Sequence, residues 1–278
     1  MTKPGIMMMV LVTTALGFYF ADHGIHRPWL LLWTLIGSAL TCGGASVLNQ
    51  YLERDADAVM RRTQHRPIPT GLISPEEAMS FGLCLILIGL FVFCMKVNLL
   101  TAFLSLLTCF LYIVVYTPMK KLTWLNTTFG AIPGAIPPLG GWAAATNHLD
   151  PGAWILFLIM FTWQHPHFYA IAWLLKEDYK KAGFKMLPVV HPDAKYTFSQ
   201  ITAFSILLIA FSLMPSLIGM SGKIYFWGAL GLGAGVLYTA FLFQHSQSNL
   251  DARKVLAASI MYLPLLLVLI IVDGFFYI

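Results

Sequence analysis

A run of acidic, amide and basic side chains follows the second long apolar segment of the chain. Residues 49–71 read NQYLERDADAVMRRTQHRPIPTG. We expect the helix of the apolar segment to continue into this run until Pro67 and Pro69 stop it. A second four-spaced pair of residues, Arg62 and Arg66, lies beside the main row. Residues spaced by four share one helix face, and this face carries Asn49, Glu53, Asp57 and Arg61.

Such a face combines the groups that bind a magnesium diphosphate. Carboxylates are hard oxygen ligands for Mg²⁺, which usually keeps waters and substrate phosphates among its ligands. Guanidinium groups bind phosphate oxygens through paired hydrogen bonds. The spacing leaves one alternative open, a row of salt bridges within the helix that join Glu53 or Asp57 to Arg61.

The composition indicates the environment that holds this run. Of 278 residues, 58% are hydrophobic and 10% are charged, whereas about 25% are charged in an ordinary globular protein. A water-soluble fold of this size cannot bury so much apolar surface. The 14% aromatic content argues against disorder. We therefore expect an all-α, polytopic membrane protein with a single domain over residues 1–278, embedded in the lipid bilayer.

Nine segments are apolar enough to cross a bilayer core, which takes about 17–25 helical residues. Lys and Arg set the orientation, because fourteen of the seventeen lie before the first segment or after an even-numbered one. This bias predicts a cytoplasmic amino terminus and an outside carboxyl terminus. The net charge of +5 is thus explained by the loops between membrane segments, and we expect no nucleic-acid partner. The segments are 5–21, 28–50, 78–95, 99–116, 124–145, 152–175, 197–219, 224–243 and 255–272.

Two of these segments have unusual content. The fifth is rich in Pro and Gly, which we expect to break a regular helix. A membrane protein tolerates such a break where the backbone lines a cavity. This fifth segment is predicted to form the wall of a substrate chamber. The sixth carries Gln164 and His167 inside the membrane, where polar groups are costly and are functional candidates. The alternative is a histidine that packs between helices and hydrogen-bonds a neighbouring carbonyl.

The first motif resembles a known family. The pattern N-x-x-x-[D/E]-x-x-x-D, followed by a basic run and R-P-x-P-x-G, resembles the first signature of the UbiA-type intramembrane prenyltransferases. This resemblance implies a bundle of nine transmembrane helices around a central cavity. It also implies Mg²⁺ bound by Glu53 and Asp57, with Asn49 as a supporting catalytic residue. Gln50 stands where that signature has Asp.

Three further stretches resemble one branch of that family, protohaem IX farnesyltransferase. They read YTPMKKLTWLNT, FGAIPGAIPPLGGWAA and TWQHPHFYAIAWLLKEDYKKAGFKMLPVV. The branch implies transfer of a farnesyl group from farnesyl diphosphate to the vinyl group of haem B, with addition of water, to give haem O. It also implies the cell inner membrane as the location. Haem-handling or oxidase-assembly proteins are the implied protein partners.

The same resemblance assigns roles to individual residues. Haem binding is assigned to Gln164 and His167, whereas His165 fills a variable position. Glu177 and Asp178 form a second polar site, in place of the Asp-rich motif of quinone-type relatives. Aromatic faces for an allylic cation come from Tyr51, Tyr116, Trp163 and Tyr169. Diphosphate binding is assigned to Arg61, Arg62, Arg66, Lys120, Lys121 and Lys176.

Two other functions remain open at this level. A prenyltransferase that acts on a quinone precursor or chlorin would share the first motif, but it should carry the second Asp-rich motif. A membrane transporter also uses broken helices with charged ends. It would more naturally show an internal repeat, and the two halves of the sequence show none.

Overall fold

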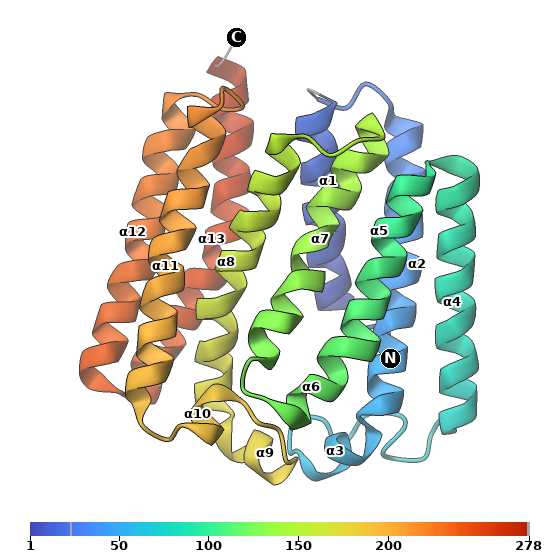
Figure 1. Ribbon diagram of the computed structural model, residues 1–278, viewed down its shortest axis with the longest axis vertical. Helices are drawn as coiled ribbons and strands as arrows, with labels where there is room; N and C mark the ends of the chain where they lie inside the picture. Colours follow the sequence, from blue (N-terminus) through green and yellow to red (C-terminus); the bar gives the residue numbers. More distant parts are fainter. Residues whose placement is uncertain (23, 277–278) are drawn as a thin grey trace.

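The computed structural model describes residues 1–22 and 24–276, and every regular element in this part is helical. Short helices lie between the long ones: α3 (Arg54–Val59), α9 (Lys176–Lys181) and α10 (Leu187–Val190). The helix α5 (Leu99–Phe110) continues through a π-helical turn (Leu111–Tyr116) into α6 (Thr117–Leu122). The other long helices, shown in Figure 1, are α1 (Pro4–Ala21), α2 (Pro28–Leu52), α4 (Pro75–Lys96), α7 (Asn126–Thr146), α8 (Pro151–Leu174), α11 (Ala194–Leu217), α12 (Lys223–Ser246) and α13 (Asn249–Phe276).

The helices have the length and apolarity of a multi-pass membrane protein. Within the described residues, seven helical segments are long and apolar enough to cross a membrane: α1, α2, α4, the α5–α6 segment, α11, α12 and α13. Helices α7 and α8 have similar lengths but are not among these seven. The all-helical membrane class is thus confirmed, and the count of nine crossings stays a prediction.

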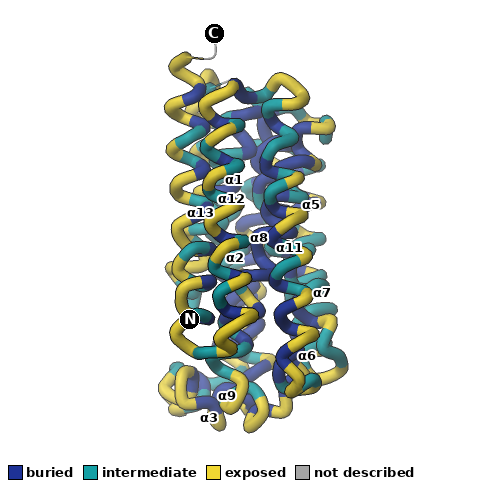
Figure 2. Tube along the Cα trace, turned by 90° about the vertical axis from the view of Figure 1, so that its left-hand side faces the viewer, coloured by how far each residue is buried: buried dark blue, intermediate teal, exposed yellow. Residues whose placement is uncertain are grey.

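Buried residues line the inner faces of the helices, and exposed residues cover the outer faces (Figure 2). The exposed side chains include large apolar ones such as Leu87, Phe91 and Trp227. In water such a surface would be unfavourable, whereas lipid tails cover it without cost. Small residues let the helices approach closely. A Cβ atom added to Gly141 on α7 would overlap the carbonyl oxygen of Thr14 on α1.

Helix α7 corrects one expectation from the sequence. It runs unbroken through Pro133, Pro137 and Pro138, although we expected this content to break it. A proline removes one backbone donor and crowds the preceding turn. Here α1, α5 and α8 pack around the helix, and such burial among neighbouring helices compensates for the lost donors. Helix α8 likewise continues through Pro166.

The short helices α3, α6, α9 and α10 gather at one end of the bundle (Figure 1). We call residues 53–74 and 175–193 the cap. Its two parts pack against each other through buried apolar residues, including Ala56 and Met60 from the first and Phe184 and Met186 from the second. The cap is also tied to the bundle, because the Lys185 N–H donates to the Lys120 carbonyl at 2.7 Å. The long polar loops predicted after the second, fourth and sixth segments therefore meet at one end.

Candidate functional site

The end of α2 presents three polar side chains beneath the cap. Helix α2 ends at Leu52, and α3 begins at Arg54. The backbone hydrogen bonds nevertheless continue, because the Glu53 N–H donates to the Asn49 carbonyl and the Asp57 N–H donates to the Glu53 carbonyl. The predicted four-residue spacing thus holds as far as Asp57. Asn49 and Asp57 are 0% exposed and Glu53 is 7% exposed, although all three are polar.

The helix then ends earlier than predicted. Helix α3 stops at Val59, and Met60 has an extended backbone, so the helix does not reach Pro67. Two contacts explain this end. The Met60 side chain is buried in the cap, and the Thr63 hydroxyl donates to the Asp57 carbonyl at 3.0 Å, which satisfies a carbonyl at the helix end. As a consequence Arg61 leaves the predicted face, and both Arg61 and Arg62 are exposed.

Each of the three polar side chains contacts a cation, and two of these cations come from distant segments of the chain. Lys120 Nζ lies 2.6 Å from Glu53 Oε1, and an Arg66 guanidinium nitrogen lies 2.6 Å from Asp57 Oδ2. These pairs replace the intrahelical salt bridges with Arg61 that the spacing left open. Charge-assisted contacts of this length are the strong class of hydrogen bond. They join α2, α3, α6 and the cap into one polar cluster.

Lys3 is the third cation of the site, and no role in a site was predicted for it from the sequence. Its ammonium group donates to Asn49 Oδ1 at 2.6 Å and lies 3.5 Å from the Tyr112 hydroxyl. Burial lowers the pKa of Lys3 to about 7, and the charges of Lys120 and Arg66 act in the same direction. The only sequence signal was a Lys directly before the Pro that begins α1. In the sequence analysis, Lys3 contributes only to the Lys and Arg count that predicts the membrane orientation.

The oxygens of this cluster suit a divalent cation. Asp57 Oδ1 is buried and accepts no hydrogen bond from any described residue. Such an orphaned carboxylate oxygen is costly unless a ligand completes it. The described residues contain no group of three or more His, Cys, Asp or Glu side chains arranged for a metal. Mg²⁺ needs fewer, since one or two carboxylates with water and substrate phosphates suffice. Glu53, Asp57 and the Asn49 amide oxygen therefore fit this ion.

Aromatic rings lie beside the cations. The ammonium group of Lys120 lies 4.6 Å from the centre of the Tyr116 ring, and Tyr116 stacks on Tyr112 at 5.6 Å. Of the four aromatic residues proposed for an allylic cation, Tyr116 is thus in the polar cluster. The Tyr51 ring instead faces Arg54, and Trp163 donates from its indole nitrogen to the Ser259 carbonyl on α13. Tyr169 is buried among α8, α11 and α13.

Other predicted diphosphate and acidic residues lie at the surface of the cap and of the neighbouring helix α6. Lys121, Lys176 and Glu177 are exposed, and Asp178 is half-buried. The Lys176 ammonium group lies over the Trp173 ring at 5.3 Å. Among the ion pairs of residues 1–22 and 24–276, none joins these four residues to Glu53 or Asp57. The structure therefore brings Arg66 and Lys120 to the acidic cluster, but not Arg61, Arg62, Lys121 or Lys176.

The polar residues of α8 contact neighbouring helices. Gln164 donates to the Ala131 carbonyl at 3.1 Å. His167 Nδ1 lies 3.0 Å from the Ser259 hydroxyl, and its ring stacks on Trp163. His165 instead stacks on Phe204 at 3.5 Å. Because α8 is helical here, the two histidines face different neighbours, and the haem contact of His167 stays a prediction.

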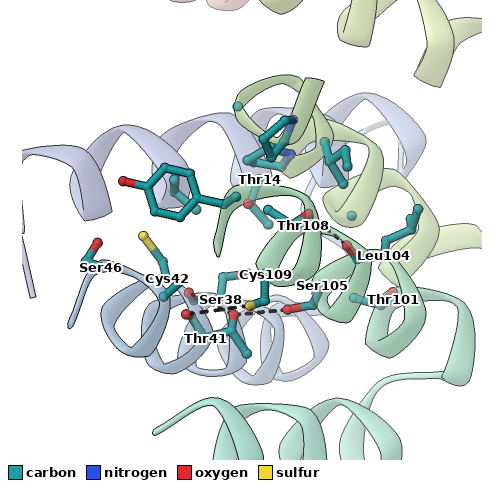
Figure 3. A pocket seen from close by; sticks show the side chains of 18 of the residues that line it. Thr14, Ser38, Thr41, Cys42, Ser46, Thr101, Leu104, Ser105, Thr108 and Cys109 are labelled. Carbon is teal, nitrogen blue, oxygen red and sulfur yellow. Dashed lines mark hydrogen bonds between the residues drawn. The ribbon is translucent and has the colours of Figure 1, made fainter. Parts of the chain in front are cut away.

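A cavity begins beside the polar cluster and lies between α1, α2, α4, α5 and α7. Together with the open solvent at its edge it encloses about 720 Å³. Tyr112, which contacts Lys3, lines it, and so do Pro133, Gly134 and Pro137. The prediction that the Pro- and Gly-rich segment forms the wall of a chamber is thus confirmed in its geometry. Figure 3 shows Ser46 and Cys42 toward one end of the cavity and Thr101 and Leu104 toward the other.

Three of the hydroxyl groups that line this cavity donate hydrogen bonds within the protein. Thr41 donates to the Gly37 carbonyl at 3.0 Å. Ser105 donates to Thr41, and Thr108 donates to the Leu104 carbonyl (Figure 3). These bonds leave methyl and methylene groups facing the space. The lining is therefore suited to an apolar chain that has a charged head at the polar cluster.

Comparisons with known proteins agree with this arrangement. A protein of Solibacter usitatus named protoheme IX farnesyltransferase is 44% identical, over 98% of this chain and 97% of the relative. The structure of a digeranylgeranylglyceryl phosphate synthase superposes with a TM-score of 0.81 at 18% identity, over 96% of this chain and 93% of the other. A UbiA homologue from Archaeoglobus fulgidus bound to DMAPP and Mg²⁺ superposes with a TM-score of 0.70 at 18% identity, over 98% of each chain.

The family assignment rests on the sequence match, since likeness at 18% identity shows the fold alone. The model of the UbiA prenyltransferase family matches residues 10–269, which covers α2 with its acidic end, the chamber and α8. With this match and a nearly full-length relative at 44% identity, the chain belongs to the UbiA prenyltransferase family and is a prenyl-transferring enzyme.

Proposed function

We propose that this chain transfers a farnesyl group from farnesyl diphosphate to the vinyl group of haem B, with addition of water, to give haem O and diphosphate. The observation that carries the proposal is a buried cluster of acidic and basic groups at the mouth of an apolar cavity. An amphiphile with an anionic head and an isoprenoid tail matches both parts. The farnesyl and haem components follow the name of the Solibacter usitatus relative.

Glu53 and Asp57 would hold Mg²⁺, with Asn49 as a further oxygen ligand. The orphaned Asp57 Oδ1 supports this assignment. The ion would neutralise charge on the departing diphosphate. The Archaeoglobus fulgidus homologue was solved with DMAPP and Mg²⁺, which supports the same pairing of metal and prenyl diphosphate here.

Arg66, Lys120 and Lys3 bind the diphosphate oxygens in this proposal. Without substrate, each of these cations contacts one of the residues that would hold the ion. If Glu53, Asp57 and Asn49 held the ion, the three cations beside them would be placed to contact the diphosphate. Fixed cations in a buried site stabilise a leaving anion far more than they would in water.

Departure of the diphosphate leaves an allylic cation on the farnesyl group. The stacked rings of Tyr112 and Tyr116 lie beside Lys120 and can stabilise this cation through their faces. The haem vinyl group then attacks the allylic carbon. Water adds to the resulting cation on the haem side chain and gives up a proton to the released diphosphate, which leaves a hydroxyl group. Gln164 and His167 are the proposed haem contacts, and the protein is proposed to lie in the inner membrane with the cap in the cytoplasm.

The test is the product itself. Purified protein in detergent is incubated with haem B, farnesyl diphosphate and Mg²⁺, and the extracted haems are analysed by mass spectrometry. We expect haem O, which disappears when either Mg²⁺ or farnesyl diphosphate is left out. Farnesylation of an added quinone precursor, with haem B left unchanged, would overturn the proposed acceptor.

A further inference from the structure

The cavity has a defined length along the bundle. On α5 and the turn that follows it, the lining residues run from Thr101 to Tyr112. At 1.5 Å per residue this stretch rises about 16 Å. Tyr112 marks the end beside the polar cluster, because its hydroxyl lies 3.5 Å from the Lys3 ammonium group. Thr101 lies two residues after the start of α5 and marks the opposite end.

A single aromatic ring stands at that opposite end. Phe93, near the end of α4, is 1% exposed and lines the cavity together with Ser38 and Thr101. Its ring occupies a notch in α2. A Cβ atom added to Gly37 would lie 2.8 Å from two carbons of this ring, a distance at which the ring must move. Gly37 therefore fixes how far the ring is withdrawn from the cavity.

Helices α2 and α4 are too close for the ring to move away easily. A Cβ atom added to Gly89, one turn before Phe93, would lie 3.0 Å from the Gly37 carbonyl oxygen. A larger residue at position 37 thus has backbone on one side and the ring on the other. The direction left for the ring is into the cavity.

We propose that Phe93, held in the notch at Gly37, is the end wall that sets the length of isoprenoid chain this enzyme accepts. The proposal rests on the proposed function, in which the cavity takes the prenyl tail. A farnesyl main chain extends about 14 Å when its carbon–carbon bonds are about 1.5 Å long. That length fills the cavity from Tyr112 to Phe93, whereas one more isoprene unit meets the ring.

Binding of prenyl compounds of three chain lengths tests whether Phe93 is the end wall, and it needs no prenyl acceptor. Geranyl, farnesyl and geranylgeranyl thiolodiphosphates, which resist loss of the diphosphate, are titrated with Mg²⁺ into the purified protein in detergent. We expect the unaltered chain to favour the farnesyl compound. Phe93→Ala should raise the affinity for the geranylgeranyl compound relative to farnesyl by about tenfold or more, because the added unit becomes buried. Phe91→Ala is the matched control, since Phe91 lies on the outer face of α4.

The opposite change should shorten the cavity. Gly37→Ala is expected to lower farnesyl affinity relative to geranyl by about tenfold, because the ring is pushed toward the substrate. Gly231→Ala, on α12 with open space around it, controls for the effect of a helical Gly-to-Ala change. If Gly37→Ala fails to fold, the double variant with Phe93→Ala removes the clash and should recover both folding and geranylgeranyl binding.

The outcomes separate this inference from the proposed function. If Phe93→Ala and the double variant fold but keep the chain-length preference of the unaltered protein, Phe93 is not the end wall, and the inference fails. If the preferences shift as expected but no haem O forms, the wall stands and the acceptor is wrong. If no prenyl compound binds to the unaltered protein, both ideas are overturned.

Discussion

Three contacts assemble the polar cluster: Lys3 with Asn49 and Lys120 with Glu53, which join residues far apart in the chain, and Arg66 with Asp57, which lie nine residues apart. Each buries a charged group that would be unfavourable alone. Removing one member therefore affects both its partner and the substrate. Variants at this scale need a control that separates loss of chemistry from loss of folding.

Asp57→Asn should lower turnover about 10²- to 10³-fold, since it removes a charge from the proposed metal ligands and unbalances Arg66. The shape of the side chain is kept, so we expect the protein to reach the membrane in normal amounts. Activity is measured as haem O formed, and abundance by immunoblot. If the folded protein is lost instead, the Asp57–Arg66 pair is mainly structural.

Lys3→Met should raise the dissociation constant of farnesyl diphosphate about tenfold or more, because a charged hydrogen bond is worth about 1.5–3 kcal/mol. Lys3→Arg keeps the charge and should recover most of the affinity. Lys96→Met is the control, because Lys96 lies in the last turn of α4, at the end away from the cap. This variant should bind farnesyl diphosphate normally. Unchanged affinity in Lys3→Met would assign Lys3 to helix packing.

His167→Ala should raise the dissociation constant of haem B about ten- to a hundredfold and alter the haem absorption spectrum, if the imidazole contacts iron or a propionate. The same change also removes the contact with Ser259. Ser259→Ala therefore tests packing alone and should leave haem affinity nearly unchanged. The His165 ring packs on Phe204, so His165→Ala should also leave haem affinity nearly unchanged. If Ser259→Ala weakens haem binding as much as His167→Ala, position 167 only packs.

At the scale of elements, the sequence predicted features that depend on local helix geometry better than features that depend on tertiary contacts. The four-residue spacing placed Asn49, Glu53 and Asp57 on one face, because such spacing depends only on helix geometry. Arg61 left this face because Met60 packs against residues more than 100 positions away, which no local pattern contains. Lys3 was missed for the same reason, since its partners Asn49 and Tyr112 are 46 and 109 residues distant.

The cap offers a test at this scale. Phe184, in the loop after α9, is buried in one cluster with Ala56 on α3, and its ring lies 5.6 Å from the Lys120 ammonium group. Phe184→Ala leaves a cavity, and such a change typically lowers the free energy of unfolding by about 3–5 kcal/mol. We expect faster hydrogen exchange in residues 53–74 and 175–193, together with a higher KM for farnesyl diphosphate. Leu72→Ala, an exposed change in the same cap, is the control. Unaltered exchange in Phe184→Ala would show that the two parts of the cap are held by other contacts.

The whole molecule separates a polar end from an apolar interior. The cap lies at one end of the bundle (Figure 1). The acidic residues and their cations lie at the same end, and the cavity extends from there toward the opposite end. Diphosphates do not cross a bilayer unaided, because an ion in hydrocarbon loses its hydration. The side of the membrane on which the cap lies therefore decides which compartment supplies the prenyl donor.

The excess of Lys and Arg near the cap predicts that it lies in the cytoplasm. Single cysteines at Gln64 in the cap and at His148 in the loop between α7 and α8 can test this in a variant whose four native cysteines are replaced. Both positions are exposed and lie at opposite ends of the bundle. In intact cells, a membrane-impermeant maleimide should label His148→Cys alone, whereas opened cells should show labelling of both. Labelling of Gln64→Cys in intact cells would place the site on the outer face, where the donor would have to be supplied from outside the cytoplasm.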